Sequence, residues 1–444
     1  MKALNSLQNY YNTDEVVNLL NQSSSPLENS KDLDPLMEYI GDAKYVLLGE
    51  ASHGTHEYYT WRMKITQRLI KEKNFSFVGV EGDWPDCYRL NRFAKGYSHS
   101  GKDVYSILHE FNRWPTWMWA NWEVLAFIEW MKDFNKTLSS EKRVGFYGLD
   151  VYSLGESMQA IVTYLEKNDP EALKTAKHAI KCFEPYGDEG QAYAQASMLV
   201  PELCQKEVVQ LLTEIRSKIS QYNSDYENVF STEQNAIIAV NAEKYYRAMV
   251  KGGPQSWNIR DRHMVLTLER LMKFHGKNSK TIIWEHNTHI GDARATDMAS
   301  EGMVNVGQLI REQHAKEGVV AVGFGSFKGS VIAGRNWGDT MHKMKMPQAI
   351  EGSWEHIFHK ASGGKNKLLI MDKIKNEECI SAPIGHRAIG VVYNPEREKF
   401  GNYVPTILPM RYDAFIFLDE TKALHPLHIQ PDGHQIPETY PFGV

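Results

Sequence analysis

Short apolar runs alternate with longer segments of helical periodicity over the first 150 residues. Residues 44–48, 75–80 and 144–149 form apolar runs of the length expected for buried strands. Between them, residues 55–73 and 121–138 place large apolar side chains every three or four positions, which is the spacing of an amphipathic helix. Strands that alternate with helices in this way are typical of a parallel sheet with right-handed crossovers.

The pattern becomes entirely helical between residues 152 and 275. The periodicity predicts helices at residues 153–167, 170–183, 190–222, 232–250 and 258–275. Ser231 and Gln234 have the spacing of a capping box, which would start the fourth of these helices. An apolar run at residues 281–285 then resumes the strand pattern. Later strands are predicted at residues 319–325, 367–371, 388–392 and 414–418, with a helix near 353–362.

These patterns predict an α/β fold with a parallel-sheet core, an inserted all-helical subdomain and a C-terminal mixed α+β region. We expect residues 1–150 and 276–325 to form the core with the cleft. Residues 151–275 would form the helical insertion, and residues 326–444 would complete the core and the cleft.

Polar residues follow four of the predicted strands directly. The stretches are GEASHGTHE (49–57), EGDW (81–84), Asp150 and EHNTH (285–289). Ligands of open α/β sheets bind at the carboxyl ends of the strands. If the four strands are parallel neighbours, seven side chains converge there: Glu50, His53, Glu81, Asp83, Asp150, His286 and His289.

Glu50 and His53 together suggest a general base whose tautomer is fixed by a carboxylate. His289 is the candidate for a second acid or base, and for the base itself if His53 is not. Arg62, on the following helix, would hold a carboxylate or an oxyanion. His56 lies in the first turn of that helix, and we expect it to be a supporting or surface residue.

Plainer interpretations of the same residues exist. Glu50 and His53 would also suit an exposed loop, and His286 would suit a buried, hydrogen-bonded position. One of the two acids Glu81 and Asp83 would suit a helix cap. The two His-x-x-His pairs, with acids nearby, leave a divalent metal site open as an alternative, although they lack the His-Glu-x-x-His pattern. The sequence has no G-x-S-x-G nucleophile elbow and no phosphate-binding glycine loop.

Composition narrows the class of protein further. A net charge of -5 over 444 residues argues against a nucleic-acid partner. No apolar run reaches the roughly 20 residues of a membrane helix, and the N-terminus lacks the apolar segment of a signal peptide. The four cysteines are too sparse for a disulfide framework or a thiolate zinc site, so we expect a cytoplasmic protein with no membrane association.

Tryptophans are concentrated near the second predicted strand and after it, at positions 84, 114, 117 and 119. Such a group suits a cleft for a large apolar ring, and it suits a surface on which helices pack equally well.

The run LLGEASHGTHEYYTWRMKITQRLIKEKNFSFVGVEGDWPDCYRLNRF resembles the erythromycin esterase family, and IIWEHNTHIGD resembles its second signature region. The resemblance extends from about residue 35 to 420. It implies an α/β core with a helical insertion, a deep cleft, and metal-independent hydrolysis of a macrolide lactone in the members that confer antibiotic resistance. It also implies that His53 activates water and that Glu50, Glu81, Arg62 and His289 line the same site. Some bacterial members are labelled succinoglycan biosynthesis proteins, and many do not act on erythromycin, so the substrate does not follow from the family.

We therefore expect a hydrolase that cleaves a carboxylic ester or macrolactone with histidine-activated water, without a covalent nucleophile, cofactor or metal. The expected catalytic residues are His53, Glu50, His289 and Glu81. The expected substrate contacts are Arg62, Asp83, Trp84, His286 and Asn287. A metal-dependent hydrolase and a non-enzymatic protein that binds a small molecule in the same cleft are the alternatives, and the oligomeric state stays open.

Overall fold

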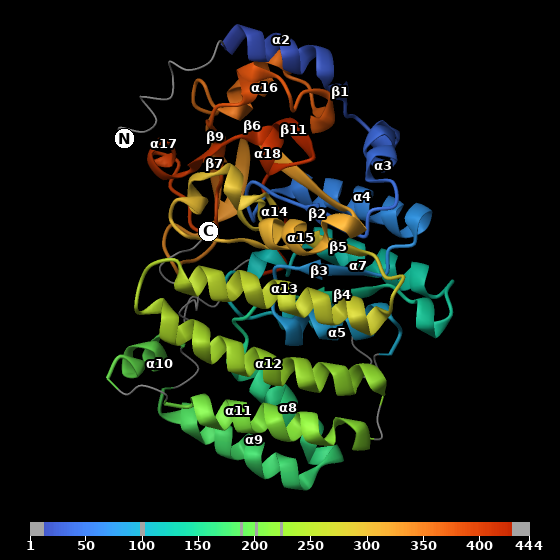
Figure 1. The fold of residues 1–444 in the computed structure, drawn as a ribbon, viewed down its shortest axis with the longest axis vertical. Helices are drawn as coiled ribbons and strands as arrows, with labels where there is room; N and C mark the ends of the chain where they lie inside the picture. Colours follow the sequence, from blue (N-terminus) through green and yellow to red (C-terminus); the bar gives the residue numbers. More distant parts are fainter. Residues whose placement is uncertain (1–12, 98–102, 187–189, 200–202, 223–224, 429–444) are drawn as a thin grey trace.

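The computed structural model describes residues 13–97, 103–186, 190–199, 203–222 and 225–428. Its centre is a mostly parallel sheet (Figure 1) with the strand order β1-β8-β11-β6-β2-β5-β3-β4 and β7 paired to β6. The bounds are β1 Ser25–Pro26, β2 Tyr45–Leu48, β3 Phe77–Val80, β4 Gly145–Gly148, β5 Thr281–Trp284, β6 Val319–Ala333, β7 His342–Met346, β8 Lys367–Ile370 and β11 Ala414–Thr421. Strands β9 (Ile384–Arg387) and β10 (Tyr403–Thr406) form a separate antiparallel pair.

Strands β2, β5, β3 and β4 are neighbours and parallel to one another. Strands β6 and β11 continue the parallel arrangement beside β2. Strand β8 runs antiparallel to β11, and β1 runs antiparallel to β8. The C-terminal strands thus extend the same sheet as the N-terminal ones. All four carboxyl ends that carry the predicted polar residues therefore lie at one edge of the sheet.

Helices cover both faces of the sheet because its central strands are buried on both sides. Helices α4 (His56–Lys73), α5 (Trp84–Ala94) and α7 (Trp122–Asn135) pack against the face that Val46 and Leu48 present. Helices α13 (Gln255–His275) and α15 (Val306–His314) pack against the opposite face, where Tyr45 and Leu47 point. Alternate residues of β2 thus enter different cores, as the pleat requires.

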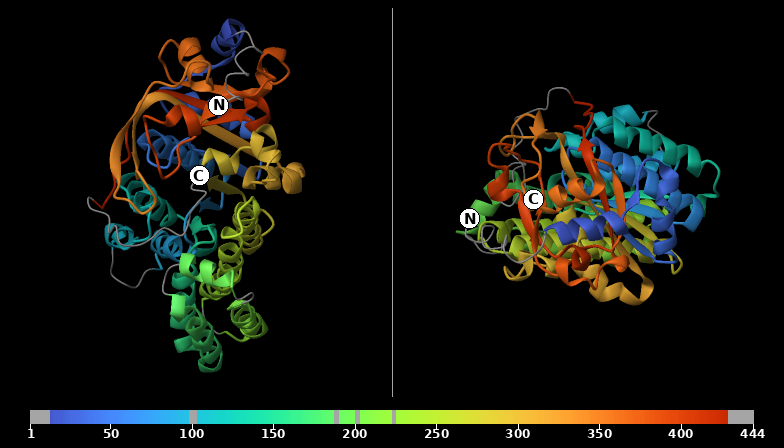
Figure 2. Two further views of the ribbon diagram at one scale, coloured as in Figure 1. Left: turned by 90° about the vertical axis from the view of Figure 1, so that its left-hand side faces the viewer. Right: turned by 90° about the horizontal axis from the view of Figure 1, so that it is seen from above.

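Five helices form a layer away from the sheet, at the lower end of Figure 1 and in the left view of Figure 2. They are α8 Leu154–Asn168, α9 Pro170–Phe183, α10 Gly190–Ser197, α11 Gln205–Lys218 and α12 Tyr226–Met249. Their apolar side chains make a hydrophobic cluster of their own. Helix α13 returns the chain to the sheet. The remaining helices are α2 Thr13–Ser23, α3 Asp34–Ile40, α6 Val104–His109, α14 Asn287–Ile290, α16 Trp354–Ser362, α17 Glu398–Gly401 and α18 Leu408–Arg411.

Three local predictions were wrong. Residues 388–392 are not a strand: β9 ends at Arg387, and Ile389 makes only a single bridge to Ser52. The helix predicted at 190–222 is two helices, α10 and α11. Ser231 and Gln234 lie inside α12, which begins at Tyr226 with the Asp225 side chain as its cap. Their side chains instead contact Trp84 and Thr267, so tertiary contacts explain these polar residues better than capping does.

The cysteine prediction also needs correction. Cys182 and Cys204 form a disulfide between the end of α9 and the start of α11. The two residues are 22 apart in the sequence, but the packing of α9 against α11 brings their Cα atoms to 5.7 Å, within the range that a disulfide spans. Cys87 and Cys379 are free.

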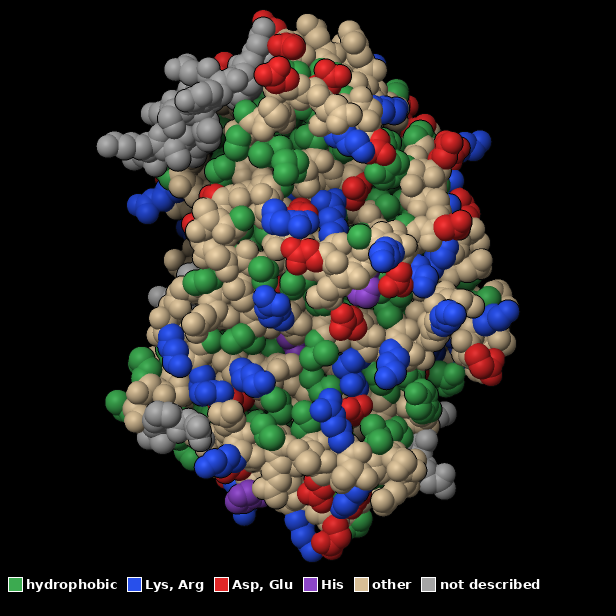
Figure 3. Space-filling model, in the orientation of Figure 1, with side chains coloured by type: hydrophobic (Ala, Val, Ile, Leu, Met, Phe, Trp, Pro, Cys, Tyr) green, Lys and Arg blue, Asp and Glu red, His purple; other side chains and the backbone are tan. Residues whose placement is uncertain are grey.

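None of the described helices combines the length and the apolar character needed to cross a bilayer. On the face shown in Figure 3, lysine and arginine side chains are interspersed with aspartate and glutamate.

Candidate active site

The carboxyl ends of β2, β5, β3 and β4 bring buried acids and histidines together. Glu50 follows β2, Glu81 follows β3, and Asp150 follows β4, each with at most 4% of its surface exposed. His286 and His289 follow β5 and are fully buried. The close packing of these strand ends also explains Gly49, because a Cβ atom there would lie 2.1 Å from Oδ1 of Asn287.

Glu50 links His53 to Arg62. Its Oε1 lies 2.9 Å from Nδ1 of His53, and its Oε2 accepts a hydrogen bond of 2.6 Å from Nη2 of Arg62. The Arg62 guanidinium is fully buried over the rings of Tyr59 and Trp284. Because both carboxylate oxygens are engaged as acceptors, His53 carries its proton on Nδ1 and its Nε2 has a free lone pair.

The His53 ring lines a cavity and is positioned to exchange a proton there. Burial lowers the pKa of His53, but the negative charge of Glu81 and the hydrogen bond to Glu50 outweigh it, so the pKa lies above the usual 6.5. Nε2 makes no hydrogen bond to any described residue. A general base steered by a carboxylate requires an arrangement of this kind.

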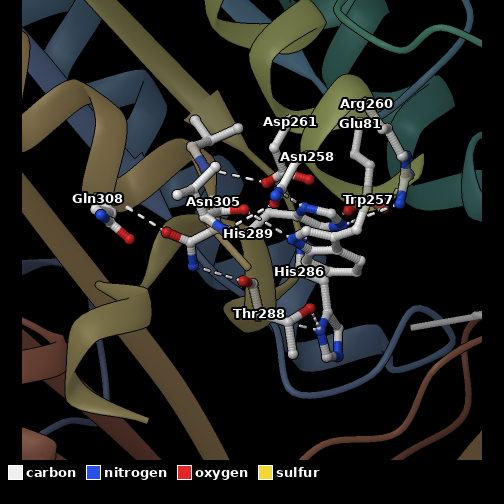
Figure 4. A network of polar contacts seen from close by, with 12 residues as sticks. Glu81, Trp257, Asn258, Arg260, Asp261, His286, Thr288, His289, Asn305 and Gln308 are labelled. Carbon is white, nitrogen blue, oxygen red and sulfur yellow. Dashed lines mark hydrogen bonds and ion pairs between the residues drawn. The ribbon is translucent and has the colours of Figure 1, made fainter. Parts of the chain in front are cut away.

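Arg260, from helix α13, is the hub of the polar network shown in Figure 4. Its Nε and Nη2 donate to the two oxygens of Asp150 at 3.0 and 2.7 Å. The same Nη2 donates to Oε1 of Glu81 at 2.7 Å, and Nη1 lies 3.0 Å from Nε2 of His289. One guanidinium therefore joins residues that follow three different strands.

His289 is held on three sides. Its Nδ1 lies 2.9 Å from Oδ1 of Asp261, and its ring stacks on Trp257 with centroids 4.5 Å apart (Figure 4). Since Asp261 accepts and Arg260 can only donate, the ring is the neutral tautomer with its proton on Nδ1. Its Nε2 lone pair is occupied by Arg260, so this conformation does not leave His289 free to accept a proton from water.

Glu81 is a permanently ionised carboxylate in this network. Burial would raise the pKa of Glu81, but the Arg260 guanidinium, a protonated His53 and the backbone N–H of His286 hold it well below its usual value. The backbone N–H of His286 donates to its Oε2 at 2.9 Å. Glu81 thus supplies negative charge close to His53 without taking part as an acid near neutral pH.

His286 and Asn287 lie next to the site but do not line the cavity. Nδ1 of His286 accepts from the backbone of Thr288, and the ring centroid lies 4.9 Å from that of His53. Burial lowers the pKa of His286 well below 6.5, with the neighbouring His53 adding to the effect, so the ring is neutral. The Asn287 side chain is bonded to both the carbonyl and the N–H of Phe324, which fixes β5 to β6 rather than facing the cavity.

The cavity beside His53 has about 970 Å³ of space between atoms, part of it open to solvent. Its polar lining includes Glu81, Asp150, Arg260 and the ion pair in which Nε of Arg113 lies 2.7 Å from Oδ2 of Asp83. Burial raises the pKa of Asp83 well above its usual value, although the charge of Arg113 opposes the shift. Aromatic rings make up much of the remaining lining: Phe111, Trp114, Trp119, Tyr152, Tyr245, Trp257 and Trp337.

Trp84, expected to contact the substrate, does not line this cavity. Its ring is fully buried, stacks on Tyr88 and Tyr147, and donates from Nε1 to Ser231. Trp117 is likewise a core residue. Arg62 also lies outside the cavity lining, since its fully buried guanidinium donates to Glu50. Sequence spacing alone could not separate tryptophans of the core from those of the cavity wall.

Sequence reasoning missed Arg260, Asp261, Trp257 and Arg113. The first three lie on helix α13, whose amphipathic pattern made their side chains look like ordinary helix surface. Glu285 is the first residue of EHNTH, and its local sequence pattern does not single it out. It is fully buried, and neither of its carboxylate oxygens has a hydrogen-bond partner among the described residues. A fully buried acid at a strand end is the signal that would have identified it.

The cavity residues do not form a set of three metal ligands within the described structure. The group whose ligand atoms lie within 4.8 Å of one another is His56, Glu123 and His425, and none of these lines the cavity.

The amino-acid sequence is similar to known proteins of one family. The family model described as erythromycin esterase matches residues 70–421. That match begins after Glu50 and His53, and it includes Glu81, Arg260, His286 and His289. A curated relative, erythromycin esterase type II of Escherichia coli, is 22% identical over 400 residues, which are 84% of this chain and 91% of the relative.

Solved structures show the same fold. A succinoglycan biosynthesis protein aligns with a TM-score of 0.77 and 21% identity, covering 93% of this chain and 98% of its own. A protein from Bacillus cereus aligns with a TM-score of 0.78 and 20% identity, covering 94% and 100%. A mutant of the erythromycin esterase EreC in its open conformation aligns with a TM-score of 0.65 and 14% identity, covering 91% and 96%.

Proposed function

The chain belongs to the erythromycin esterase family, and we propose that it hydrolyses a carboxylic ester or lactone with a water molecule activated by His53. One observation carries this proposal: Nδ1 of His53 is bound to Glu50 at 2.9 Å while the ring lines the cavity with Nε2 unbonded. A histidine held in this way has the tautomer that a general base requires.

The reaction follows from the positions of these groups. Nε2 of His53 takes a proton as the water oxygen attacks the ester carbonyl carbon, and the carbonyl becomes a tetrahedral oxyanion. Glu50 and the charge of Glu81 stabilise the imidazolium that forms. The imidazolium then returns its proton to the departing alkoxide oxygen as the carbon–oxygen bond breaks, which yields an acid and an alcohol.

Arg260 is the best-placed group to stabilise the oxyanion. It lines the cavity and carries a fixed positive charge, whereas Arg62 is buried under Glu50. A fixed cation beside developing negative charge lowers the barrier because it needs little reorganisation. The role first expected of Arg62 is thus better supported for Arg260, and Arg62 orients Glu50.

A direct attack by water is favoured over a covalent intermediate. Thr116 and Ser256 supply the aliphatic hydroxyl groups of the cavity lining, and neither is hydrogen bonded to a histidine in the described structure. Without a base on the hydroxyl, neither is activated as a nucleophile. The aromatic lining supports a substrate with a large apolar part, and a macrolide lactone is one candidate of that kind.

The test compares His53→Asn with His289→Asn and a distant control, His359→Asn. Each purified variant is assayed on a panel of simple esters and lactones that includes erythromycin. His53→Asn should lose about 10²–10⁴-fold in kcat/KM with an unchanged circular dichroism spectrum, whereas the control should retain full activity. Full activity of His53→Asn would exclude His53 as the base.

Two further measurements on the wild-type protein distinguish the proposed esterase from a metal-dependent hydrolase and from a binding protein. If turnover of the wild-type protein is lost on dialysis against a chelator and returns with a divalent metal, the reaction is metal-dependent. If the wild-type protein binds members of the panel but turns none over, the cleft belongs to a binding protein. The contacts of Arg260 with Glu81 and His289 favour the first proposal over a metal-dependent one, since they already engage the atoms that a metal would need.

A further inference from the structure

Two histidines converge on one buried carboxylate outside the cavity. Nδ1 of His56 and Nδ1 of His425 lie 2.5 and 2.6 Å from the same oxygen, Oε1 of Glu123. His56 begins α4, Glu123 lies in the first turn of α7, and His425 follows β11. The Glu123 side chain is 3% exposed, whereas those of His56 and His425 are 31% and 60% exposed.

The second oxygen of Glu123 is without a partner. Oε2 is buried and makes no hydrogen bond to another described residue. A buried carboxylate that leaves one oxygen unpaired while two imidazoles share the other is poorly satisfied by hydrogen bonds alone. An ion bound between the three side chains would engage the carboxylate more completely.

The three side chains offer the donor set of a transition-metal site. Two imidazole nitrogens and one carboxylate oxygen are ligands that Zn²⁺ prefers, and their ligand atoms lie within 4.8 Å of one another. In a tetrahedral site with bonds of about 2.0–2.2 Å the ligand atoms lie roughly 3.3 Å apart. The histidines must therefore withdraw slightly from Oε1, which the exposed His425 has room to do.

We propose that His56, Glu123 and His425 form a structural binding site for a divalent transition-metal ion such as zinc. The ion takes the place of the Nδ1 protons that the imidazoles now direct at Glu123, and each ring then carries its proton on Nε2. A water molecule completes the fourth position on the exposed side of His425. The site is separate from the proposed catalytic residues, because none of its ligands lines the cavity.

The position of the site indicates what the ion would stabilise. The segment from Lys422 to Leu427 crosses the starts of α4 and α7 and is tied to both by backbone hydrogen bonds. The backbone N–H of His56 donates to the carbonyl of Lys422, and that of Trp122 donates to the carbonyl of His425. His56 lies three residues after His53, so an ion here would fix the C-terminal segment against the loop that carries the proposed base.

The experiment uses the full chain, freed of metal with a chelator and desalted, and titrated with zinc chloride by calorimetry and by thermal denaturation. The variant is His425→Ala, which removes an exposed ligand and is expected to fold. The matched control is His359→Ala, since His359 forms a similar pair with one carboxylate, Asp419, at 2.6 Å but has no third ligand.

We expect the wild-type protein and the control to bind one zinc ion with a rise in melting temperature. His425→Ala should bind zinc roughly a hundredfold more weakly, since even the loss of a supporting contact costs about 10–100-fold. Equal binding by His425→Ala and wild type, no binding by wild type, or weak binding by the control would each overturn the proposal.

Discussion

Nη1 of Arg260 lies 3.0 Å from Nε2 of His289 and occupies the nitrogen that a general base would need. The sequence left His53 and His289 as rival bases, because both follow strands and both have acids nearby. The contact favours His53, whose Nε2 is unbonded at the cavity. His289 instead helps to position Arg260 and Glu81.

Loss of Arg260 should be costly for stability as well as for activity. Arg260→Gln leaves Glu81 and Asp150 buried without their cation, and breaking a buried ion pair typically costs about 3–5 kcal/mol. Chemical denaturation of the variant measures the free energy of unfolding, and ester hydrolysis measures the loss of oxyanion stabilisation.

Arg270→Gln is the matched control, since Arg270 lies on the same helix and pairs with Glu233 in a more exposed position. The side chains of that pair are 19% and 14% exposed, so solvent screens it more than the Arg260 pairs and its loss should cost less free energy. Similar destabilisation by the two substitutions would contradict the central role of Arg260.

Activity should rise with pH as His53 loses its proton. Because the pKa of His53 lies above 6.5, the acidic limb of the kcat/KM profile should have its midpoint above pH 6.5. Glu81→Gln removes the largest charge that raises this pKa, so the midpoint should move to lower pH. Glu227 is a buried acid that pairs with Lys95 and does not line the cavity, so Glu227→Gln should leave the midpoint in place. An unmoved midpoint in Glu81→Gln would show that Glu81 does not act on the base.

The two classes of tryptophan should respond differently to substitution. Trp337 lines the cavity and is only partly buried, so Trp337→Ala should raise KM for bulky esters roughly tenfold, about 1.4 kcal/mol, with a small loss of stability. Trp84→Phe removes a buried hydrogen bond to Ser231 and should cost about 1–3 kcal/mol of unfolding free energy. KM of Trp84→Phe should not change, and a large rise would mean that Trp84 contacts substrate after all.

Glu285 and Asp261 are both fully buried acids, and replacing each by its amide should change stability in opposite directions. Burial raises the pKa of Glu285 well above 4.5, with the charges of Glu81 and Asp261 adding to it. In the unfolded chain the pKa is about 4.3, so above that pH the folded state keeps a proton that the unfolded state has lost, and stability falls as pH rises. Glu285→Gln removes this penalty, and its melting temperature relative to wild type should increase between pH 5 and pH 8.

Asp261→Asn is the comparison for that experiment. Asp261 accepts from His289 and from the backbone N–H of Val306, and its loss should cost about 1–3 kcal/mol. A Glu285→Gln protein that is less stable than wild type at pH 8 would mean that Glu285 has an ionic partner.

The sequence predicted the sheet well because the signal for each strand is local. Residues 45–48 and 281–284 are short apolar runs between polar segments, and burial of both faces of a parallel sheet requires such runs. The polar residues that follow them fall at one edge by the same logic. For this reason the sequence alone predicts which polar residues lie together at the strand ends: Glu50, His53, Glu81, His286 and His289.

Other features depend on contacts between distant segments, and no local pattern encodes them. Arg260 and Asp261 are helix residues in the sequence, and only the packing of α13 against the sheet turns them toward Glu81 and His289. The disulfide and the pairing of His56 with His425 arise in the same way.

The chain thus determines by itself which residues are buried strand, amphipathic helix and strand-end polar group, because each depends on near neighbours. The tertiary structure alone decides which nitrogen of which histidine is free. A lone pair is available or occupied according to the partner that packing places within about 3 Å of it. Here Arg260 is the partner of Nε2 of His289, whereas Nε2 of His53 has none among the described residues.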